Sequence, residues 1–239
     1  MTIKEKKIGI LGGMGPEATV ELMRRIIAAT PAHDDVDHIQ MIVDNNPKVP
    51  SRIKALIDKT GESPSAELVA MGCRLEIAGA DGLAIACNTA HFYANDIKQS
   101  VKIPLINMIE STASTVVNRV KASSSIGLLA STAVVDLGLY SQALSRSNLK
   151  TIIPKEQSEL LEIIKAVKRG DTSEQIRLNF YSIAENLLNS GASFLIIACT
   201  ELSIISDKIM DRLPVIDALD VLTNEIINFC KPANATKSK

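Results

Sequence analysis

Residues 81–90, DGLAIACNTA, and residues 193–202, SFLIIACTEL, carry the same pattern. In each stretch a short apolar run leads to Ile-Ala-Cys, and polar residues follow the cysteine directly. A short apolar run with polar flanks is typical of a strand that is buried on both faces of a parallel sheet. We therefore predict two buried parallel strands, with Cys87 at the carboxyl end of one and Cys199 at the carboxyl end of the other.

The sequences around these two stretches repeat in the same order. KIGILGG (7–13) precedes the first cysteine strand, as SIGLLAS (125–131) precedes the second. KIPLINMI (102–109) follows the first, as RLPVIDAL (212–219) follows the second. Short apolar runs that alternate with longer segments of helical spacing are typical of β/α units around a parallel sheet. We therefore predict an α/β fold of two similar lobes, each a largely parallel four-stranded sheet flanked by helices, related by a pseudo-twofold internal duplication.

Two proline-led strands, which begin at residues 104 and 214, come where each half of the sequence ends, and we expect both to cross between the halves. The last helix is then expected to return to the first half. This division assigns residues 1–103 plus 211–230 to the first lobe, residues 104–210 to the second lobe and residues 231–239 to a disordered tail. The eight predicted strands are Lys7–Leu11, His38–Val43, Gly82–Ala86, Pro104–Met108, Ser125–Ala130, Thr151–Ile153, Phe194–Ala198 and Pro214–Asp217.

The composition favours a globular protein with a small-molecule partner. Of 239 residues, 46% are hydrophobic and 22% are charged, as in an ordinary packed domain. Lysine and arginine number 26 against 27 aspartate and glutamate, so no field of one sign draws the protein to nucleic acid or to a membrane. No apolar run approaches the roughly 20 residues that span a bilayer, and MTIKEKKIGI lacks a signal-peptide core. We expect a cytoplasmic protein.

Four cysteines lie far apart, and with three histidines and no CxxC pair they predict reduced thiols and no metal site. A single buried thiol is often only a small apolar side chain, and we interpret Cys73 and Cys230 in this way. Cys87 and Cys199 differ because they occupy equivalent strand ends. In open parallel sheets, ligands bind beyond the carboxyl ends of the strands. We therefore expect both thiols to face one cleft.

Polar residues that commonly begin helices follow each of these cysteines, Asn88 and Thr89 in the first half and Thr200 and Glu201 in the second. They turn backbone N–H groups toward the end of the strand, where an anion or a thiolate is stabilised. A facing pair of thiols suits inversion at an acidic carbon, because a thiolate can remove a proton from one face while a thiol delivers one to the other. The pattern therefore predicts proton transfer between two thiols.

Several further features have both a structural and a functional interpretation. The glycine turn GILGGMGPEAT (9–19) is either a backbone-lined anion site or a plain strand-to-helix turn, and its spacing departs from the GxGxxG of dinucleotide-binding folds. Arg52, on a proline-interrupted loop, either binds a carboxylate or is simply solvated. Lys165 and Lys168 either contact a ligand or lie at an exposed helix end. His91, which has no counterpart in the second half, is expected to make local hydrogen bonds.

Taken together, GGMGPEAT (12–19), DNNPKVPSR (44–52), IACNTAH (85–91) and IACTE (197–201) resemble the aspartate and glutamate racemase superfamily, over nearly the whole chain. The NP-x-VP-x-R motif favours the aspartate branch. The resemblance implies a two-lobed α/β enzyme that uses neither PLP nor a metal, forms a homodimer and holds an amino-acid substrate between its lobes. One departure is Ala198, where many relatives have glycine.

Carried over motif by motif, the resemblance implies that Cys87 and Cys199 are the two acid–base cysteines. It implies that Arg52 holds a substrate carboxylate. The lysine of a VK-x-G motif maps to Lys168, with Lys165 as the alternative. The other implied substrate contacts are Met14, Asn88, Thr89 and Thr200.

We therefore expect a PLP-independent racemase that interconverts L- and D-aspartate through paired thiols. Within the same superfamily, the alternatives are a glutamate racemase and a broad-specificity amino-acid racemase. Outside it, they are a catalytically silent metabolite-binding protein and a nucleotide-dependent oxidoreductase. Two intact cysteines argue against a silent protein, and the glycine spacing argues against a nucleotide enzyme.

Overall fold

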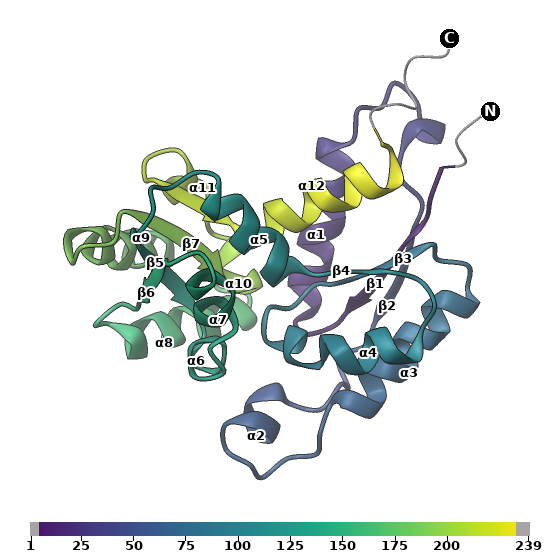
Figure 1. Cartoon of the computed structure of the whole chain (residues 1–239), viewed down its shortest axis with the longest axis horizontal. Helices are drawn as coiled ribbons and strands as arrows, with labels where there is room; N and C mark the ends of the chain where they lie inside the picture. Colours follow the sequence, from purple (N-terminus) through teal and green to yellow (C-terminus); the bar gives the residue numbers. More distant parts are fainter. Residues whose placement is uncertain (1–4, 233–239) are drawn as a thin grey trace.

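Two four-stranded parallel sheets form the framework of the protein, and the computed structural model describes residues 5–232 of the chain (Figure 1). The first sheet has the strand order β2-β1-β3-β4 and the second has the order β6-β5-β7-β8, so the two halves of the chain share one topology. This confirms the predicted α/β fold. The strands are β1 (Ile8–Gly12), β2 (Met41–Asn45), β3 (Gly82–Ile85), β4 (Leu105–Ile106), β5 (Ser125–Ala130), β6 (Lys150–Ile152), β7 (Phe194–Ala198) and β8 (Val215–Asp217).

All eight predicted strands are present, although several of their ends differ. β2 begins at Met41 instead of His38, because a short 3-10 helix ends at residue 37 and His38 is its C-cap residue. β4 ends at Ile106, because the side chain of Asn107 accepts hydrogen bonds from backbone N–H groups of the next helix, α5 (Met108–Val117), and caps it. Local capping therefore shortens strands that the apolar pattern alone would extend.

The predicted crossing of the two proline-led strands is wrong. β4 pairs with β3 in the first sheet, and β8 pairs with β7 in the second. Proline has only its carbonyl group for backbone hydrogen bonding. The Pro104 carbonyl accepts from the N–H of Leu83 at 2.8 Å, and the Pro214 carbonyl accepts from the N–H of Leu195 at 2.9 Å. Each proline thereby aligns its strand beside the cysteine strand of its own half, so the predicted boundaries place both strands in the wrong half.

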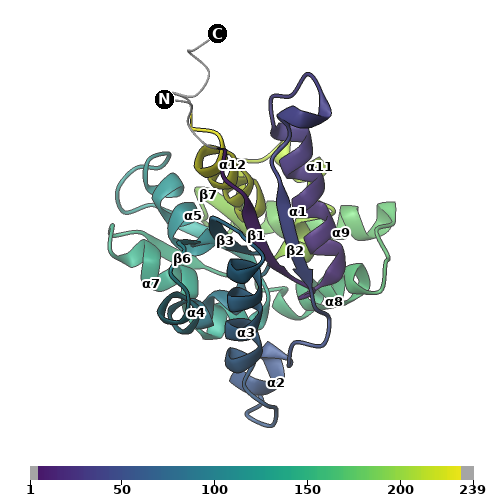
Figure 2. The same ribbon diagram turned by 90° about the vertical axis from the view of Figure 1, so that its right-hand side faces the viewer.

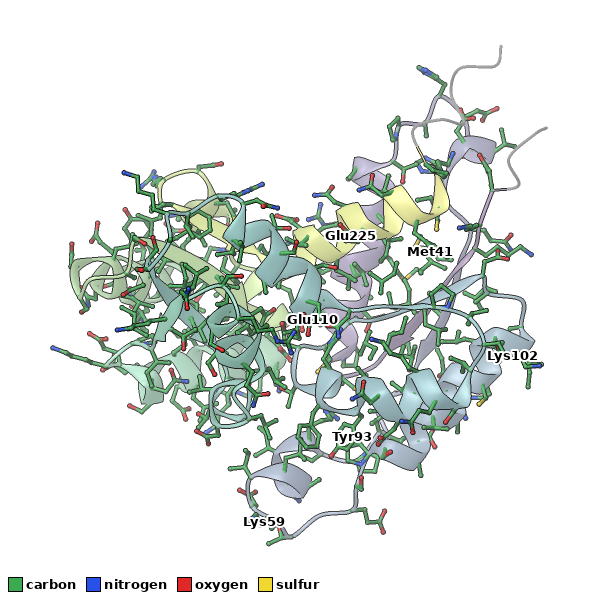
Figure 3. All side chains as sticks on the ribbon, in the orientation of Figure 1. Met41, Lys59, Tyr93, Lys102, Glu110 and Glu225 are labelled. Carbon is green, nitrogen blue, oxygen red and sulfur yellow. The ribbon has the colours of Figure 1, made fainter. Side chains whose placement is uncertain are left out.

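The helices that follow these two strands cross between the halves instead. α5 packs against α7 (Leu139–Ser145) of the second half, and α12 (Ala218–Cys230) packs against α1 (Pro16–Ala29) of the first. α5 and α12 also pack against each other where the halves meet; Figure 3 labels Glu110 on α5 and Glu225 on α12. Each sheet is therefore followed by a helix that joins it to the other.

Helices cover both faces of the first sheet. α3 (Ser65–Ile77) and α4 (Ala94–Ser100) lie on one side of it, and α1 and α12 lie on the other (Figure 2). Buried apolar side chains form three clusters, one of which contains residues of both sheets. The remaining helices are η1 (Asp35–Asp37), α2 (Arg52–Leu56), η2 (Thr89–Tyr93), α6 (Thr132–Asp136), α8 (Gln157–Lys168), α9 (Glu174–Asn189), α10 (Thr200–Ser203) and α11 (Asp207–Met210).

An ion-pair network centred on Arg25 joins α1 to the second half. The Arg25 guanidinium donates to Asp217 at the end of β8 and to Asp220 on α12, both at 2.7 Å, and to the carbonyl oxygen of Ser203 in α10. Asp217 is fully buried and also accepts a hydrogen bond from the Ser203 hydroxyl at 2.7 Å. Because α10 begins directly after Cys199, this Arg25 network holds the segment that follows the second thiol against the first half.

No helix within residues 5–232 is long and apolar enough to cross a membrane. Of the predicted disordered tail, residues 233–239 lie outside the described part of the chain. Lys231 contacts Glu5 at 3.3 Å, so this residue is part of the fold.

Candidate active site

The two cysteines that follow equivalent strands line one cavity. Cys87 comes after β3 and Cys199 comes after β7, and each is 6% exposed. The cavity has a volume of about 120 Å³, well below the roughly 300–1,000 Å³ of pockets for drug-sized ligands, so it suits a small metabolite. All eight residues that the sequence analysis selected for the site lie in its wall: Met14, Arg52, Cys87, Asn88, Thr89, Lys168, Cys199 and Thr200.

A larger cavity, of about 690 Å³, lies between α1, α12 and β8. Its wall contains the ion-paired side chains of the Arg25 network, and neither Cys87 nor Cys199 lines it. Because the predicted chemistry belongs to the thiols, we place the candidate site at the smaller cavity.

Asn88 is oriented by a hydrogen bond from the other half of the chain. Burial raises the pKa of Tyr140 on α7, so its hydroxyl stays protonated and donates to Asn88 Oδ1 at 2.6 Å. With its oxygen engaged, Asn88 has a buried amide nitrogen, Nδ2, that lacks a hydrogen-bond partner among the described residues. An unsatisfied buried donor costs about 1–3 kcal/mol, so this group is well suited to bind a ligand oxygen.

His91 supports the first thiol through the backbone. The N–H of Met108 donates to Nε2 at 3.1 Å, so Nδ1 carries the ring proton and donates to the Cys87 carbonyl oxygen at 2.8 Å. Burial lowers the pKa of His91 to about 4, and the ring is therefore neutral at neutral pH. His91 makes the local hydrogen bonds expected from the sequence and fixes the backbone at the end of β3.

Glu201 places a buried carboxyl group against the second thiol. Cys199 Sγ donates a hydrogen bond to Glu201 Oε2 at 3.1 Å, and the Glu201 side chain is buried. Burial raises the pKa of Cys199 well above its usual range, and the charge of Glu201 raises it further, so this thiol keeps its proton near neutral pH. Glu201 is not among the site residues predicted from the sequence. The signal that would have found it is its place in the IACTE motif, two residues after the thiol.

Two lysines near the end of α8 differ in their partners. Lys168 Nζ lies 3.4 Å from Glu201 Oε1. Burial alone would lower the pKa of Lys168, but attraction to the Glu201 carboxylate, and to Cys199 and Cys87 in their thiolate forms, outweighs it, so the pKa is raised and the ammonium stays charged. Lys165 also reaches the cavity wall, yet its ammonium pairs with the exposed Glu162 at 2.8 Å. This geometry favours Lys168 as the lysine of the site.

Arg52 brings a positive charge to the cavity from a projecting segment. It begins α2, whose N-cap residue is Ser51, and Figure 3 labels Lys59 at the far end of the same segment. Arg52 Nη1 donates to the carbonyl oxygen of Pro50 at 3.0 Å, and no carboxylate of residues 5–232 lies within ion-pair distance of it. The guanidinium is therefore available to a ligand carboxylate.

The glycine turn between β1 and α1 brings Met14 to the cavity. Gly13 has φ +87°, and a Cβ there would lie 2.3 Å from the backbone of Asn46, so this position requires glycine. A Cβ on Gly15, the N-cap residue of α1, would lie 3.5 Å from Glu201 Oε1. The anion that lies beside this helix N-terminus is thus a carboxylate of the protein itself.

The other two cysteines lie outside the cavity. The Cys73 thiol donates to the carbonyl oxygen of Ser100 at 3.6 Å, and Cys230 is buried at the end of α12, where burial raises its pKa to about 11. Within the part of the chain that the structure describes, no group of three or more His, Cys, Asp or Glu side chains is placed to hold a metal ion.

Comparisons with known proteins match the chain over most of its length. The family model for Asp/Glu/hydantoin racemases matches residues 11–226. The structure of Picrophilus torridus aspartate racemase superposes with a TM-score of 0.83 at 32% identity, covering 93% of each chain. An aspartate racemase homologue from Pyrococcus horikoshii has a TM-score of 0.74 at 22% identity, covers 94% of this chain and 99% of its own, and supports the fold alone. The broad-specificity amino-acid racemase RacX of Bacillus subtilis is 26% identical over 227 residues, which are 92% of this chain and 96% of that protein.

Proposed function

The chain belongs to the Asp/Glu/hydantoin racemase family, and we propose that it is an aspartate racemase in which Cys87 and Cys199 are the two acid–base groups, with no need of PLP or a metal ion. The observation that carries this proposal is the pair of thiols at equivalent strand ends, both in the wall of one small cavity. Similarity at 32% identity to an aspartate racemase supports the same substrate class.

In the proposed reaction a thiolate removes the α-proton and a thiol replaces it on the opposite face. With Cys87 as the thiolate, the Cα–H bond breaks, an S–H bond forms at Cys87, and the electron pair stays on the α-carbon and its carboxylate. The S–H bond of Cys199 then breaks, and its proton forms the new Cα–H bond on the other face. Product leaves with Cys87 protonated and Cys199 as the thiolate, and the opposite direction uses the same steps in reverse.

The polar groups of the cavity wall suit a dicarboxylate. Asn88 Nδ2 and the residues that follow the thiols can donate hydrogen bonds to the α-carboxylate, where negative charge grows in the transition state. Arg52 can bind the side-chain carboxylate through two parallel hydrogen bonds. Because Lys168 is engaged by Glu201, Arg52 is the cation of this cavity that has no carboxylate partner in the described chain. This charge balance favours an acidic amino acid over a neutral one.

The small volume of the cavity favours aspartate over glutamate. Glutamate is longer by one methylene group, and in hydrophobic pockets one methylene changes the discrimination between substrates by about 10- to 200-fold. We therefore propose aspartate as the preferred substrate and glutamate as a weaker one. A broad-specificity racemase would instead turn over neutral amino acids at comparable rates.

Incubation with L-aspartate in deuterated buffer, without PLP or metal, tests substrate and mechanism together. We expect D-aspartate that carries α-deuterium, formed at least about 10-fold faster than product from L-glutamate or L-alanine. Cys73→Ser is the control for the serine variants of Cys87 and Cys199, because Cys73 lies outside the cavity. Equal turnover of neutral amino acids would assign broad specificity, and binding of aspartate without exchange would assign a silent binding protein.

We further propose a homodimer, because the family resemblance implies one. Size-exclusion chromatography with light scattering should give a mass near twice the 25.7 kDa of one chain. A mass equal to one chain would reject this assembly.

A further inference from the structure

Glu201 is a buried ionisable group that the two-thiol reaction does not by itself require. Its carboxyl group touches a reacting atom, since Oε2 lies 3.1 Å from Cys199 Sγ. The second oxygen, Oε1, is buried without a hydrogen-bond partner among residues 5–232 and lies 3.4 Å from Lys168 Nζ. Burying a carboxylate beside a thiol costs free energy, and an uncharged side chain would fill the same space without that cost. Packing alone therefore does not account for Glu201.

The equivalent position in the first half is Thr89, two residues after Cys87. Threonine carries no charge, and the nearby His91 ring is neutral and bonded to backbone groups on both sides. Cys87 thus has no carboxylate in the segment that follows it. The two thiols are alike in strand position and different in the charge beside them.

We propose that Glu201 is a third acid–base group of this site, which shares one proton with Cys199 and thereby makes Cys199 the acid and Cys87 the thiolate base of the resting enzyme. This inference rests on the proposed racemase function and adds the resting distribution of protons to it. The titratable and charged groups that line the same cavities as Glu201 are Cys199, Cys87, Arg52, Lys165 and Lys168, and Glu17 at the start of α1.

The proton balance of one turnover gives Glu201 a defined task. After Cys199 has given its proton to the substrate, its thiolate lies beside the Glu201 carboxylate, and two like charges this close favour the uptake of a proton. An O–H bond of a water molecule breaks as Glu201 takes its proton, which leaves hydroxide; the new O–H bond of Glu201 then breaks as the proton passes to Sγ, which forms the S–H bond and restores the carboxylate. The S–H bond of Cys87 breaks in the same cycle, and its proton joins the hydroxide to form water again, so the protons balance. The Lys168 ammonium offsets one of the two negative charges throughout.

Thiol-specific alkylation of the unmodified protein tests the resting distribution of protons without any need for turnover. Trace iodoacetamide near neutral pH, followed by mass spectrometry of the two cysteine peptides, gives separate rates for Cys87 and Cys199. We expect Cys87 to react at least about 10-fold faster, because the thiolate is the nucleophile and a neighbouring like charge raises the pKa of a thiol. Equal rates, or a faster Cys199, would overturn the proposal.

Glu201→Gln keeps the size of the side chain and removes its charge. We expect alkylation of Cys199 to accelerate about 10-fold or more, while alkylation of Cys87 changes less than about threefold. Glu159→Gln, which removes an exposed carboxylate of α8 that lines neither cavity of Glu201, is the matched control and should change neither rate. An unchanged Cys199 rate, or equal acceleration of both thiols, would overturn the role of Glu201. If Glu201→Gln does not fold, the two rates of the unmodified protein decide.

This test and the test of the proposed function fail separately. If the two thiols are alkylated at different rates in a protein that never exchanges the α-proton of aspartate, the racemase proposal is rejected and the proposal of a shared proton stands. Racemisation by a protein whose two thiols react equally would keep the racemase and reject the role of Glu201.

Discussion

The segments that follow β3 and β7 both begin with a cysteine and then diverge. After Cys87 the chain forms the 3-10 helix η2, which contains the neutral His91, and the nearby amide of Asn88 faces the cavity. After Cys199 it forms α10, where Glu201 contacts the thiol. A duplicated framework therefore supplies two equivalent thiol positions. Side chains within four residues of each thiol, and the groups that pack on them, give the two positions different chemistry.

The strongest effect should come from removing one thiol at a time. Cys87→Ser and Cys199→Ser should each slow racemisation by about 10²- to 10⁴-fold, because each direction needs both an acid and a base. The two variants should still differ, since each keeps the group that faces one enantiomer and should exchange the α-proton of that enantiomer alone. Proton NMR of L- and D-aspartate in deuterated buffer measures this. Exchange of the same enantiomer by both variants would show that the thiols do not lie on opposite faces.

The Arg25 network anchors the segment after Cys199 to the first half, and breaking it should lower the unfolding free energy of the whole fold. Arg25→Met leaves the buried Asp217 without its charge partner, and such a change costs about 3–5 kcal/mol of unfolding free energy. Urea unfolding measures the loss. Arg146→Met is the control, because both side chains of its ion pair with Glu110 are exposed and such a pair contributes at most about 1 kcal/mol. Equal losses of unfolding free energy in both variants would show that the Arg25 network stabilises the fold no more than a surface ion pair does.

His91, in the segment after Cys87, should make the stability of the folded protein sensitive to acid. Its pKa of about 4 in the folded protein lies below the ordinary value of 6.5, so the unfolded chain binds more protons between these values and stability falls as the pH drops through them. A shift of this size corresponds to about 3 kcal/mol. His91→Gln should remove most of that contribution from the pH dependence of chemical unfolding. Parallel pH profiles for the two proteins would contradict a buried neutral histidine.

A smaller effect should follow from loosening the contact between the segment after Cys87 and α7 of the second half. Tyr140→Phe removes the hydrogen bond to Asn88 Oδ1 and should cost about 1–2 kcal/mol of transition-state stabilisation, or about 5- to 30-fold in kcat/KM for aspartate. Tyr181→Phe, which removes a hydrogen bond from an exposed hydroxyl to the Glu185 side chain, is the matched control. If both variants kept full activity, the orientation of the Asn88 amide would not matter to the reaction.

Local patterns in the chain account for the strands, for the thiols at their ends and for the glycine turn. Runs such as GLAI and FLIIA are apolar throughout because their residues are buried on both faces of a sheet, and that burial acts on each strand separately. The repeated order of motifs also predicted that Cys87 and Cys199 lie in one cavity, since equivalent strand ends meet the same cleft.

Other features depend on which distant segments meet, and local patterns do not contain that information. From the sequence, Pro104 and Pro214 are predicted to mark the boundaries between the halves, yet their carbonyl groups pair each strand with the cysteine strand of its own half. Lys165 and Lys168 are indistinguishable in a helical pattern, and only the position of Glu201 against α8 separates them. The free energy of a strand pair or of an ion pair depends on both partners together, so neither segment alone determines it. Long-range packing therefore settles the partners of these groups, whereas apolar periodicity, a property of each segment alone, is sufficient to place the strands and the two thiols.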